Sequence, residues 1–99
     1  MELGDLAEAS DKFLKLIRQH PNVTEAFYFL GQSLGQQQKL GDAYYYLGVF
    51  YMRKRDFKNA QIQLKQALKH PQDDKKRKNI NEWLSQMSET DKKQSKSGG

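Results

Sequence analysis

Apolar residues recur at intervals of three and four positions along most of this chain, the spacing that places side chains on one face of an α-helix. No stretch favours strands, so the sequence predicts an all-α fold. Two prolines, Pro21 and Pro71, divide the periodic segments, because proline cannot continue a helix interior. The pattern predicts five helices, at about residues 5–19, 24–37, 40–54, 56–70 and 74–88.

Polar residues mark the starts of several predicted helices. Thr24 and Asp56 stand directly before periodic segments, where a side-chain oxygen can accept a hydrogen bond from a free backbone N–H group. Asp73 and Asp74 begin the last segment, where a helix N-terminus favours negative charge. Residues 89–99 contain no apolar side chain, so we expect a helical domain over residues 1–88 followed by a disordered polar tail.

The composition bounds what the chain can do. It has 99 residues, 36% of them hydrophobic, and a mean hydropathy of -0.96, which supports one small domain and excludes a large multi-step enzyme. No window approaches the roughly 18 apolar residues that span a bilayer, so we expect no transmembrane segment. Cysteine is absent, which excludes disulfides, thiolate metal sites and cysteine nucleophiles.

The sequence carries no recognisable catalytic pattern. An HExxH helix, a Gly-x-Ser-x-Gly nucleophile and a glycine-rich phosphate loop are all missing. His20 and His70 both directly precede a proline at a predicted helix end, where an imidazole can bond the last carbonyl groups, so we interpret them as helix caps. We therefore expect this chain to be no enzyme and to hold no metal or cofactor.

Three further residues have predicted packing roles. Gly31 and Gly48 each follow a leucine within a helical segment, which favours positions where two helices approach closely. Trp83 shares a helix face with Ile80 and Leu84, so we expect it to anchor the last helix.

The chain is similar to itself when it is shifted by 51 residues, the separation of Asp5 and Asp56. The same shift superposes Ala9 on Ala60 and Ile17 on Leu68. Small and large residues alternating at this spacing are typical of helical-hairpin repeats, in which a small residue lets two helices cross and a large one fills the next space.

One segment of about 30 residues resembles the tetratricopeptide repeat. The matching residues are Ala43 to Tyr51, Asp56, Phe57, Ala60, Leu64, Ala67, Leu68 and Pro71. Arg55 departs from the family, which prefers glycine in this turn, and Pro71 comes one residue early. The first predicted helix resembles the second helix of an earlier repeat without its partner, so we expect the chain to begin inside an array.

The resemblance implies antiparallel helical hairpins in an α-α superhelix, with a concave groove for a peptide or partner protein. The lysine, asparagine and arginine residues that one variant of the family uses to clamp acidic chain ends are absent at the matching positions. The resemblance places the following residues on the groove: Glu25, Tyr28, Gln32, Asp42, Tyr45, Val49 and Met52.

Residues 24–88 also resemble the C-terminal region of certain bacterial zinc metallopeptidases, in their helix order and in the run of aromatic residues after Gly41-Asp42-Ala43. This resemblance implies an accessory region of an exported enzyme, in the periplasm or cell envelope, that positions substrates or docks the enzyme on a partner. The zinc and the HExxH motif would belong to a catalytic domain upstream.

Two alternatives use other features of the chain. The net charge is +5, and basic runs at residues 53–55 and 75–78 could contact nucleic acid or an anionic surface, although we favour a solvated face for both. The first predicted helix lacks a partner helix, so its apolar face could also form a weak homodimer.

Overall fold

The computed structural model describes the backbone of residues 3–98 and the side chains of residues 4–88. The described residues form five α-helices and no strand, which confirms the predicted all-α class. The helices are α1 (Leu3–Gln19), α2 (Glu25–Gln36), α3 (Leu40–Arg53), α4 (Phe57–Ala67) and α5 (Asp74–Gly98). Apart from the end of α5, every helix end lies within about three residues of its predicted position.

The last helix is longer than predicted, because its backbone continues to Gly98 and we expected it to end near residue 88. The residues beyond 88 include several good helix formers and no proline, so no strong stop signal precedes Gly98. The side chains of the expected disordered tail, residues 89–99, lie outside the described residues, and its disorder stays a prediction.

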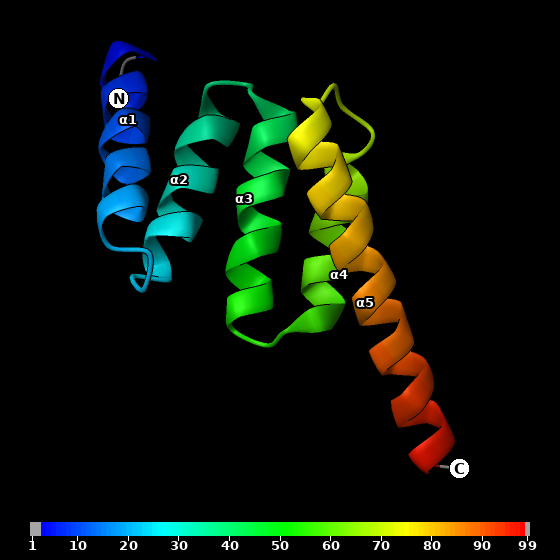
Figure 1. Ribbon diagram of the computed structural model, residues 1–99. Coiled ribbons are helices and arrows are strands. Elements are labelled where there is room, and N and C mark those ends of the chain that lie inside the picture. Colours follow the sequence, from blue (N-terminus) through cyan, green and yellow to red (C-terminus); the bar gives the residue numbers. More distant parts are fainter. Residues whose placement is uncertain (1–2, 99) are drawn as a thin grey trace.

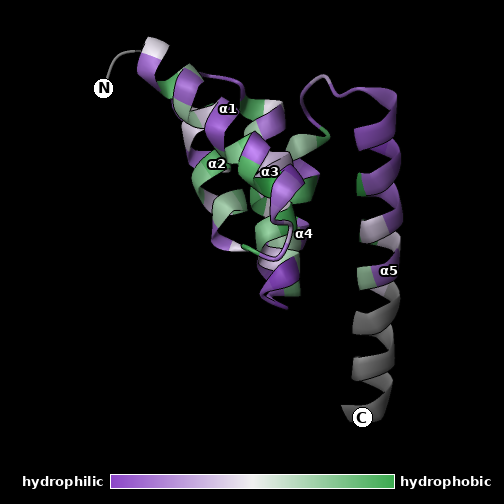
Figure 2. Ribbon diagram, turned by 60° about the vertical axis from the view of Figure 1, so that its left-hand side comes forward, coloured by the Kyte–Doolittle hydropathy of each residue, from purple (hydrophilic) through white to green (hydrophobic). Residues whose placement is uncertain are grey.

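Each helix runs antiparallel to the helix that follows it (Figure 1). The helices α1 to α4 lie side by side in chain order, while α5 crosses α4 and extends away from the other helices. Apolar residues gather where α2, α3 and α4 meet, and the N-terminal part of α5 is mostly polar (Figure 2).

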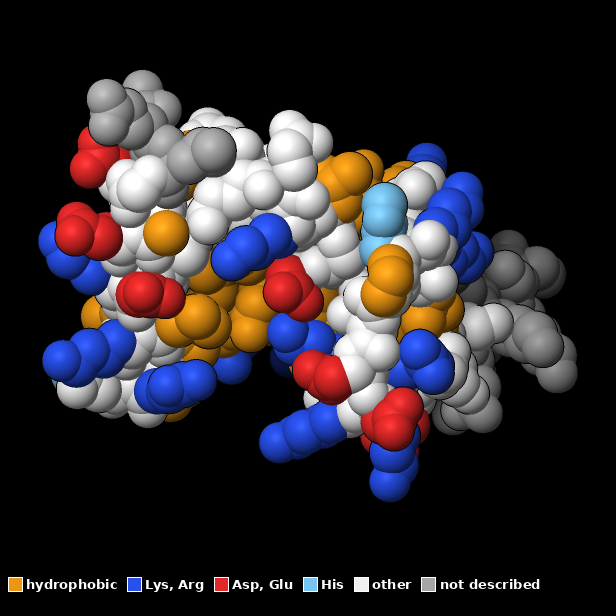
Figure 3. Space-filling view, turned by 90° about the horizontal axis from the view of Figure 1, so that it is seen from above, with side chains coloured by type: hydrophobic (Ala, Val, Ile, Leu, Met, Phe, Trp, Pro, Cys, Tyr) orange, Lys and Arg blue, Asp and Glu red, His pale blue; other side chains and the backbone are white. Residues whose placement is uncertain are grey.

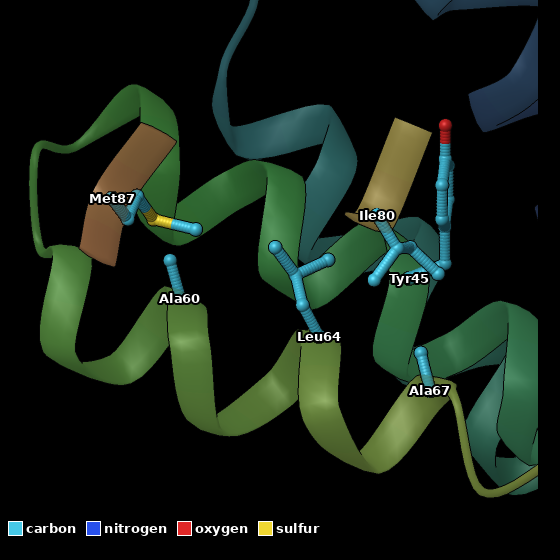
Figure 4. Close-up of a cluster of buried hydrophobic side chains, with 6 residues drawn as sticks. All are labelled: Tyr45, Ala60, Leu64, Ala67, Ile80 and Met87. Atoms are coloured by element: carbon cyan, nitrogen blue, oxygen red, sulfur yellow. The ribbon is translucent and has the colours of Figure 1, made fainter. Parts of the chain in front are cut away.

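Two clusters of buried side chains form the core. The first joins α1, α2 and α3 and consists of Leu30, Leu34 and Ala43, with Phe13, Leu14, Ile17 and Tyr46 partly buried around it. The second joins α3, α4 and α5 and consists of Tyr45, Ala60, Leu64, Ala67, Ile80 and Met87 (Figure 4). Ile80 is fully buried, whereas Trp83 and Leu84 are only half-buried, so Ile80 is the main anchor of α5 and Trp83 is a lesser one.

Gly31 and Gly48 lie where neighbouring helices cross, as predicted. A Cβ atom at Gly31 would stand 2.7 Å from Cγ of Leu47, and one at Gly48 would overlap the side chain of Leu64. The missing side chains therefore let α2 approach α3, and α3 approach α4, with a leucine filling each space.

Two helices end in the left-handed backbone conformation. Gln38 has a φ of 65° and Arg55 a φ of 61°, values that glycine adopts most readily. The N–H group of the next residue then donates a hydrogen bond back to the helix. Lys39 donates to the carbonyl oxygen of Leu34 and Asp56 to that of Tyr51, each at 2.9 Å. Arg55 thus occupies a position that favours glycine, the residue that the tetratricopeptide family prefers there.

Two helix starts are held by the aspartates that the sequence analysis placed there. The Asp56 carboxylate accepts a hydrogen bond from the Asn59 N–H group at 3.2 Å, and Asp73 does the same for Lys76 at 2.7 Å. The prediction for Thr24 is wrong, since its side chain makes no capping hydrogen bond. Thr24 already has helical dihedral angles of -60° and -39°, a geometry unlike the extended one of a capping residue.

Candidate functional site

A groove of about 380 Å³ lies between the faces of α2 and α3 and the first turns of α5. Its lining is largely aromatic and aliphatic with cations among it, and consists of Phe27, Tyr45, Tyr46, Val49, Arg53, Asp73, Lys75, Lys76, Asn79 and Trp83. Figure 3 shows a hollow on this side of the molecule, with hydrophobic side chains at its base and charged side chains around its edge.

The floor of the groove is built from two adjacent tyrosines of α3. Tyr45 is buried at 8% exposure, and its ring lies 5.2 Å from that of Tyr46. The Tyr45 hydroxyl accepts a hydrogen bond of 3.2 Å from the Asn79 side chain, and its ring contacts Trp83 at 5.7 Å. Both contacts come from α5, so they hold this helix against the floor.

Burial raises the pKa of Tyr46 above its ordinary value of 10.0, although the positive charge of Lys76 acts in the opposite direction. The hydroxyl therefore stays neutral at physiological pH. A neutral phenol on the floor can contact apolar side chains of a ligand through its ring and polar groups through its hydroxyl.

Lys76 crosses the groove from α5 to α3. Its Nζ atom donates a hydrogen bond of 3.0 Å to Oδ1 of Asp42 and lies 5.4 Å from the ring centres of both Tyr45 and Tyr46. Partial burial lowers the pKa of Lys76, but the hydrogen bond to Asp42 and the neighbouring charges outweigh it, so the pKa stands above 10.5. Lys76 is thus a cation held over an aromatic surface.

Arg53 forms another part of the wall at the C-terminus of α3. Its guanidinium lies 4.4 Å from the ring centre of Phe27 and donates a hydrogen bond to the carbonyl oxygen of Pro21. The guanidinium is thereby fixed beside the apolar floor, where it can still meet an anionic group of a ligand.

A second hollow, of about 170 Å³, continues the groove towards α1. It shares Tyr46 and Lys76 with the first hollow and is otherwise lined by residues of α1, α2 and α3 and the turn at Lys39. One of its sides is held by Gln37, whose side chain donates a hydrogen bond of 2.6 Å to the Ser10 hydroxyl. The two hollows adjoin at Tyr46 and Lys76, and their lining residues extend from α5 to α1.

A third hollow, of about 270 Å³, lies at the turns around Gly41 and Pro71. Its only aromatic lining residue is His70, whose ring stacks on Tyr44 at 5.8 Å. This packing on α3 holds the His70 ring, and the capping role predicted for His20 and His70 stays a prediction. Because the third hollow lacks an apolar floor, we take the groove beside α5 as the candidate site.

The seven predicted groove residues lie in different parts of the structure. Asp42, Tyr45 and Val49 lie on the groove or its continuation, and Met52 packs beside the core cluster that joins α3 to α5. The remaining predicted residues of α2 lie apart from both hollows.

These α2 residues form their own contacts. Gln32 donates a hydrogen bond of 2.7 Å to the Tyr28 hydroxyl, and the Tyr28 ring contacts Phe50 at 5.1 Å. Glu25 pairs with Lys54 at 3.0 Å, which lowers the pKa of this exposed carboxyl.

The sequence analysis did not place Phe27, Tyr46, Arg53, Lys76 or Trp83 on the groove. Arg53 and Lys76 belong to basic runs for which we favour a solvated face, Trp83 is predicted to anchor the last helix, and the tyrosine cluster that includes Tyr46 is open between core and groove. These residues line the groove because of the position of α5, and no local pattern in the sequence specifies that position.

No protein-family model matches the chain, and no curated protein or solved structure matches it either. The resemblances to the tetratricopeptide repeat and to the metallopeptidases therefore stay predictions. None of the described helices is both long and apolar enough to span a bilayer. Among the described side chains, no three His, Cys, Asp or Glu residues gather where they could hold a metal ion.

The two alternative functions also stay predictions. Of the basic runs, Lys54, Lys76 and Arg77 each pair with a carboxylate. The exposed large hydrophobic side chains of the described residues are Val23, Phe29, Leu40, Ile62 and Leu68, and none belongs to α1. Of the apolar side chains of α1, Phe13, Leu14 and Ile17 pack against the first core cluster.

Proposed function

We propose that the chain is a protein-interaction module of the tetratricopeptide-repeat type, which holds a peptide or helix of a partner protein in the groove between α2, α3 and α5. The helix order and the two glycine crossings support a repeat architecture with a superhelical path. By sequence resemblance alone, the proposal extends to an accessory region of an exported zinc metallopeptidase.

The observation that carries the proposal is the lining of the groove. Tyr46, Val49 and Trp83 are half-buried, so each keeps part of its surface available to a ligand. Rigid aromatic side chains offer a large contact area and lose little conformational entropy when a ligand binds. Such a surface suits a protein segment with apolar side chains better than a small hydrophilic molecule.

Val49→Gln tests the proposal, because it places a polar side chain on the floor and keeps a good helix former. We expect this variant to stay folded with a slightly lower melting temperature, because Val49 packs beside the second core cluster, and to bind peptides about five- to tenfold more weakly, the loss of roughly 1 to 1.5 kcal/mol of apolar contact. Screening an array of short peptides identifies binders, and titration of the single tryptophan, Trp83, by fluorescence measures affinity.

Ile62→Gln is the matched control, since Ile62 is 48% exposed on α4 and lies outside the groove. We expect this variant to bind peptides like the unmodified chain. A folded Val49→Gln protein with undiminished affinity for every peptide, or equal losses in the two variants, would show that the groove is not the binding site.

A further inference from the structure

The charges along the groove are unevenly distributed. The hollow beside α5 is lined by three cations, Arg53, Lys75 and Lys76, against one carboxylate, Asp73. The continuation towards α1 is balanced, because Lys39 and Lys76 face Asp11 and Asp42 there. A bound segment therefore meets a positive potential at the end beside α5 and an almost neutral one at the end beside α1.

Lys76 occupies the junction of these two parts. Its side chain is 23% exposed, and its ammonium group already pairs with a carboxylate while lying over two aromatic rings. The Asp42 side chain is 42% exposed and lines the same continuation. A carboxylate entering from solvent would therefore meet both the ammonium group and its present partner.

We infer that the groove selects a partner segment in which an acidic side chain adjoins apolar ones, and that Lys76 binds this carboxylate in competition with Asp42. The inference rests on the proposed function and adds the chemistry of the ligand. The apolar side chains of the segment contact Tyr46, Val49 and Trp83, and its carboxylate replaces that of Asp42 at Nζ of Lys76.

Complementary charge favours a protein segment over nucleic acid or an anionic membrane. Those polyanions need a row of exposed cations that follows repeated phosphates. Lys76 instead lies in a groove beside apolar side chains, and Arg77 of the same basic run pairs with Asp74. One or two carboxylates among apolar residues match this arrangement better.

Two substitutions of the same ion pair should act in opposite directions. Lys76→Gln removes the group that binds the ligand carboxylate, so we expect affinity for acidic peptides to fall about tenfold. Asp42→Asn removes the internal competitor, so we expect affinity to rise about two- to fivefold, the range that corresponds to a partly exposed ion pair. A pair that merely shapes the groove would lose affinity in both variants.

The probes are twin synthetic peptides that differ only by Glu or Gln beside a leucine, chosen from an array binding screen and titrated by Trp83 fluorescence. We expect the acidic twin to bind more tightly to the unmodified chain, and Lys76→Gln to remove this preference. Lys78→Gln is the matched control, because Lys78 belongs to the same basic run, is exposed and lines neither hollow.

Several results would overturn the inference. Equal affinity for the two twins would reject it and leave the proposed function standing, whereas no binding by any peptide would reject both. Loss of affinity in both Asp42→Asn and Lys76→Gln, with unchanged melting temperatures, would also reject it. So would equal losses in Lys76→Gln and Lys78→Gln together with displacement of the acidic twin by anionic vesicles, which would indicate a surface adaptor.

Discussion

The helices α1 to α4 and the helix α5 are attached to the molecule in different ways. Among α1 to α4, the side chain of Leu47 packs against Gly31 and that of Leu64 against Gly48, so neighbouring backbones approach closely. Both the glycines and the leucines are 17 residues apart, and so are three buried alanines, Ala26, Ala43 and Ala60. The 51-residue shift of the sequence is three of these intervals.

The helix α5 breaks this interval. One step beyond Ala60 and Leu64, the chain has Arg77 and Asn81, and both are exposed. The helix instead docks through large side chains, led by Ile80, on the second core cluster. Small residues therefore close the space between α2, α3 and α4, while large residues in another register keep α5 at a distance and leave the groove.

Truncating one fully buried side chain in α4 and one in α5 tests this comparison and should have the largest effect on stability. Leu64→Ala and Ile80→Ala should each lower the free energy of unfolding by about 2 to 5 kcal/mol. Leu64 lies inside the array, so we expect its loss to reduce amide protection in hydrogen exchange across α3 and α4. Loss of Ile80 should reduce protection mainly in α5, and an equal reduction in α2 to α4 would show that α5 is no separate unit.

Filling a glycine crossing should have the next largest effect. Gly48→Ala forces a methyl group against Leu64, which is fully buried and cannot move away, so overpacking should outweigh the gain of about 1 kcal/mol in helix propensity. We expect a net loss of about 1 to 2 kcal/mol in urea unfolding. Gly31→Ala is the comparison. Leu47 is only half-buried and can shift, and the Ala43 carbonyl oxygen, 3.2 Å from the added Cβ atom, has to give by only a few tenths of an ångström, so a larger loss there would contradict this ranking.

Replacing the left-handed residue in the turn between α3 and α4 by glycine should stabilise the protein. Arg55→Gly removes the cost of a positive φ for a residue with a Cβ atom, and we expect a gain of about 0.5 to 1 kcal/mol in the free energy of unfolding. Lys58→Gly in the first turn of α4 is the control and should lose stability instead, because glycine is a poor helix former. Destabilisation by Arg55→Gly would mean that the arginine side chain contributes more than its backbone conformation costs.

Raising the pH should have the smallest effect on stability, and it should act on the contacts of Tyr46 and Lys76 between α3 and α5. The pKa values of Tyr46 and Lys76 are both raised, so their contribution to stability is complete below about pH 10 and is lost as pH rises through the folded-state values. Melting temperatures measured between about pH 9 and 11 should fall less steeply for Tyr46→Phe and Lys76→Gln than for the unmodified chain. Parallel curves would contradict this assignment.

Much of the helical architecture could be predicted because its signals are local. The spacing of apolar residues placed the helices, and Asp56 marked the start of α4 by the bond that its side chain makes three residues along the chain. Gly31 and Gly48 were recognised by their small size within apolar helix faces. Thr24 was misjudged, since a side chain that could cap a helix does so only when its backbone is extended.

The candidate site could be predicted only in part. Asp42, Tyr45 and Val49 share one face of α3, so the repeat pattern placed them together. The other side of the groove comes from Lys76 and neighbouring residues, which are some thirty positions away in the sequence. Helix periodicity gives no information about which distant face such residues will meet.

Which residues form helices and which face of each helix is apolar follow from the amino-acid sequence, because both depend on interactions within a few positions along the chain. Tertiary packing, in contrast, places α5 beside α4 and leaves a groove with an aromatic floor and cations beside it between the first turns of α5 and the faces of α2 and α3. The physical reason is that this position depends on the volumes of Tyr45, Ile80 and Trp83, which pack together only after the chain has turned back at Pro71.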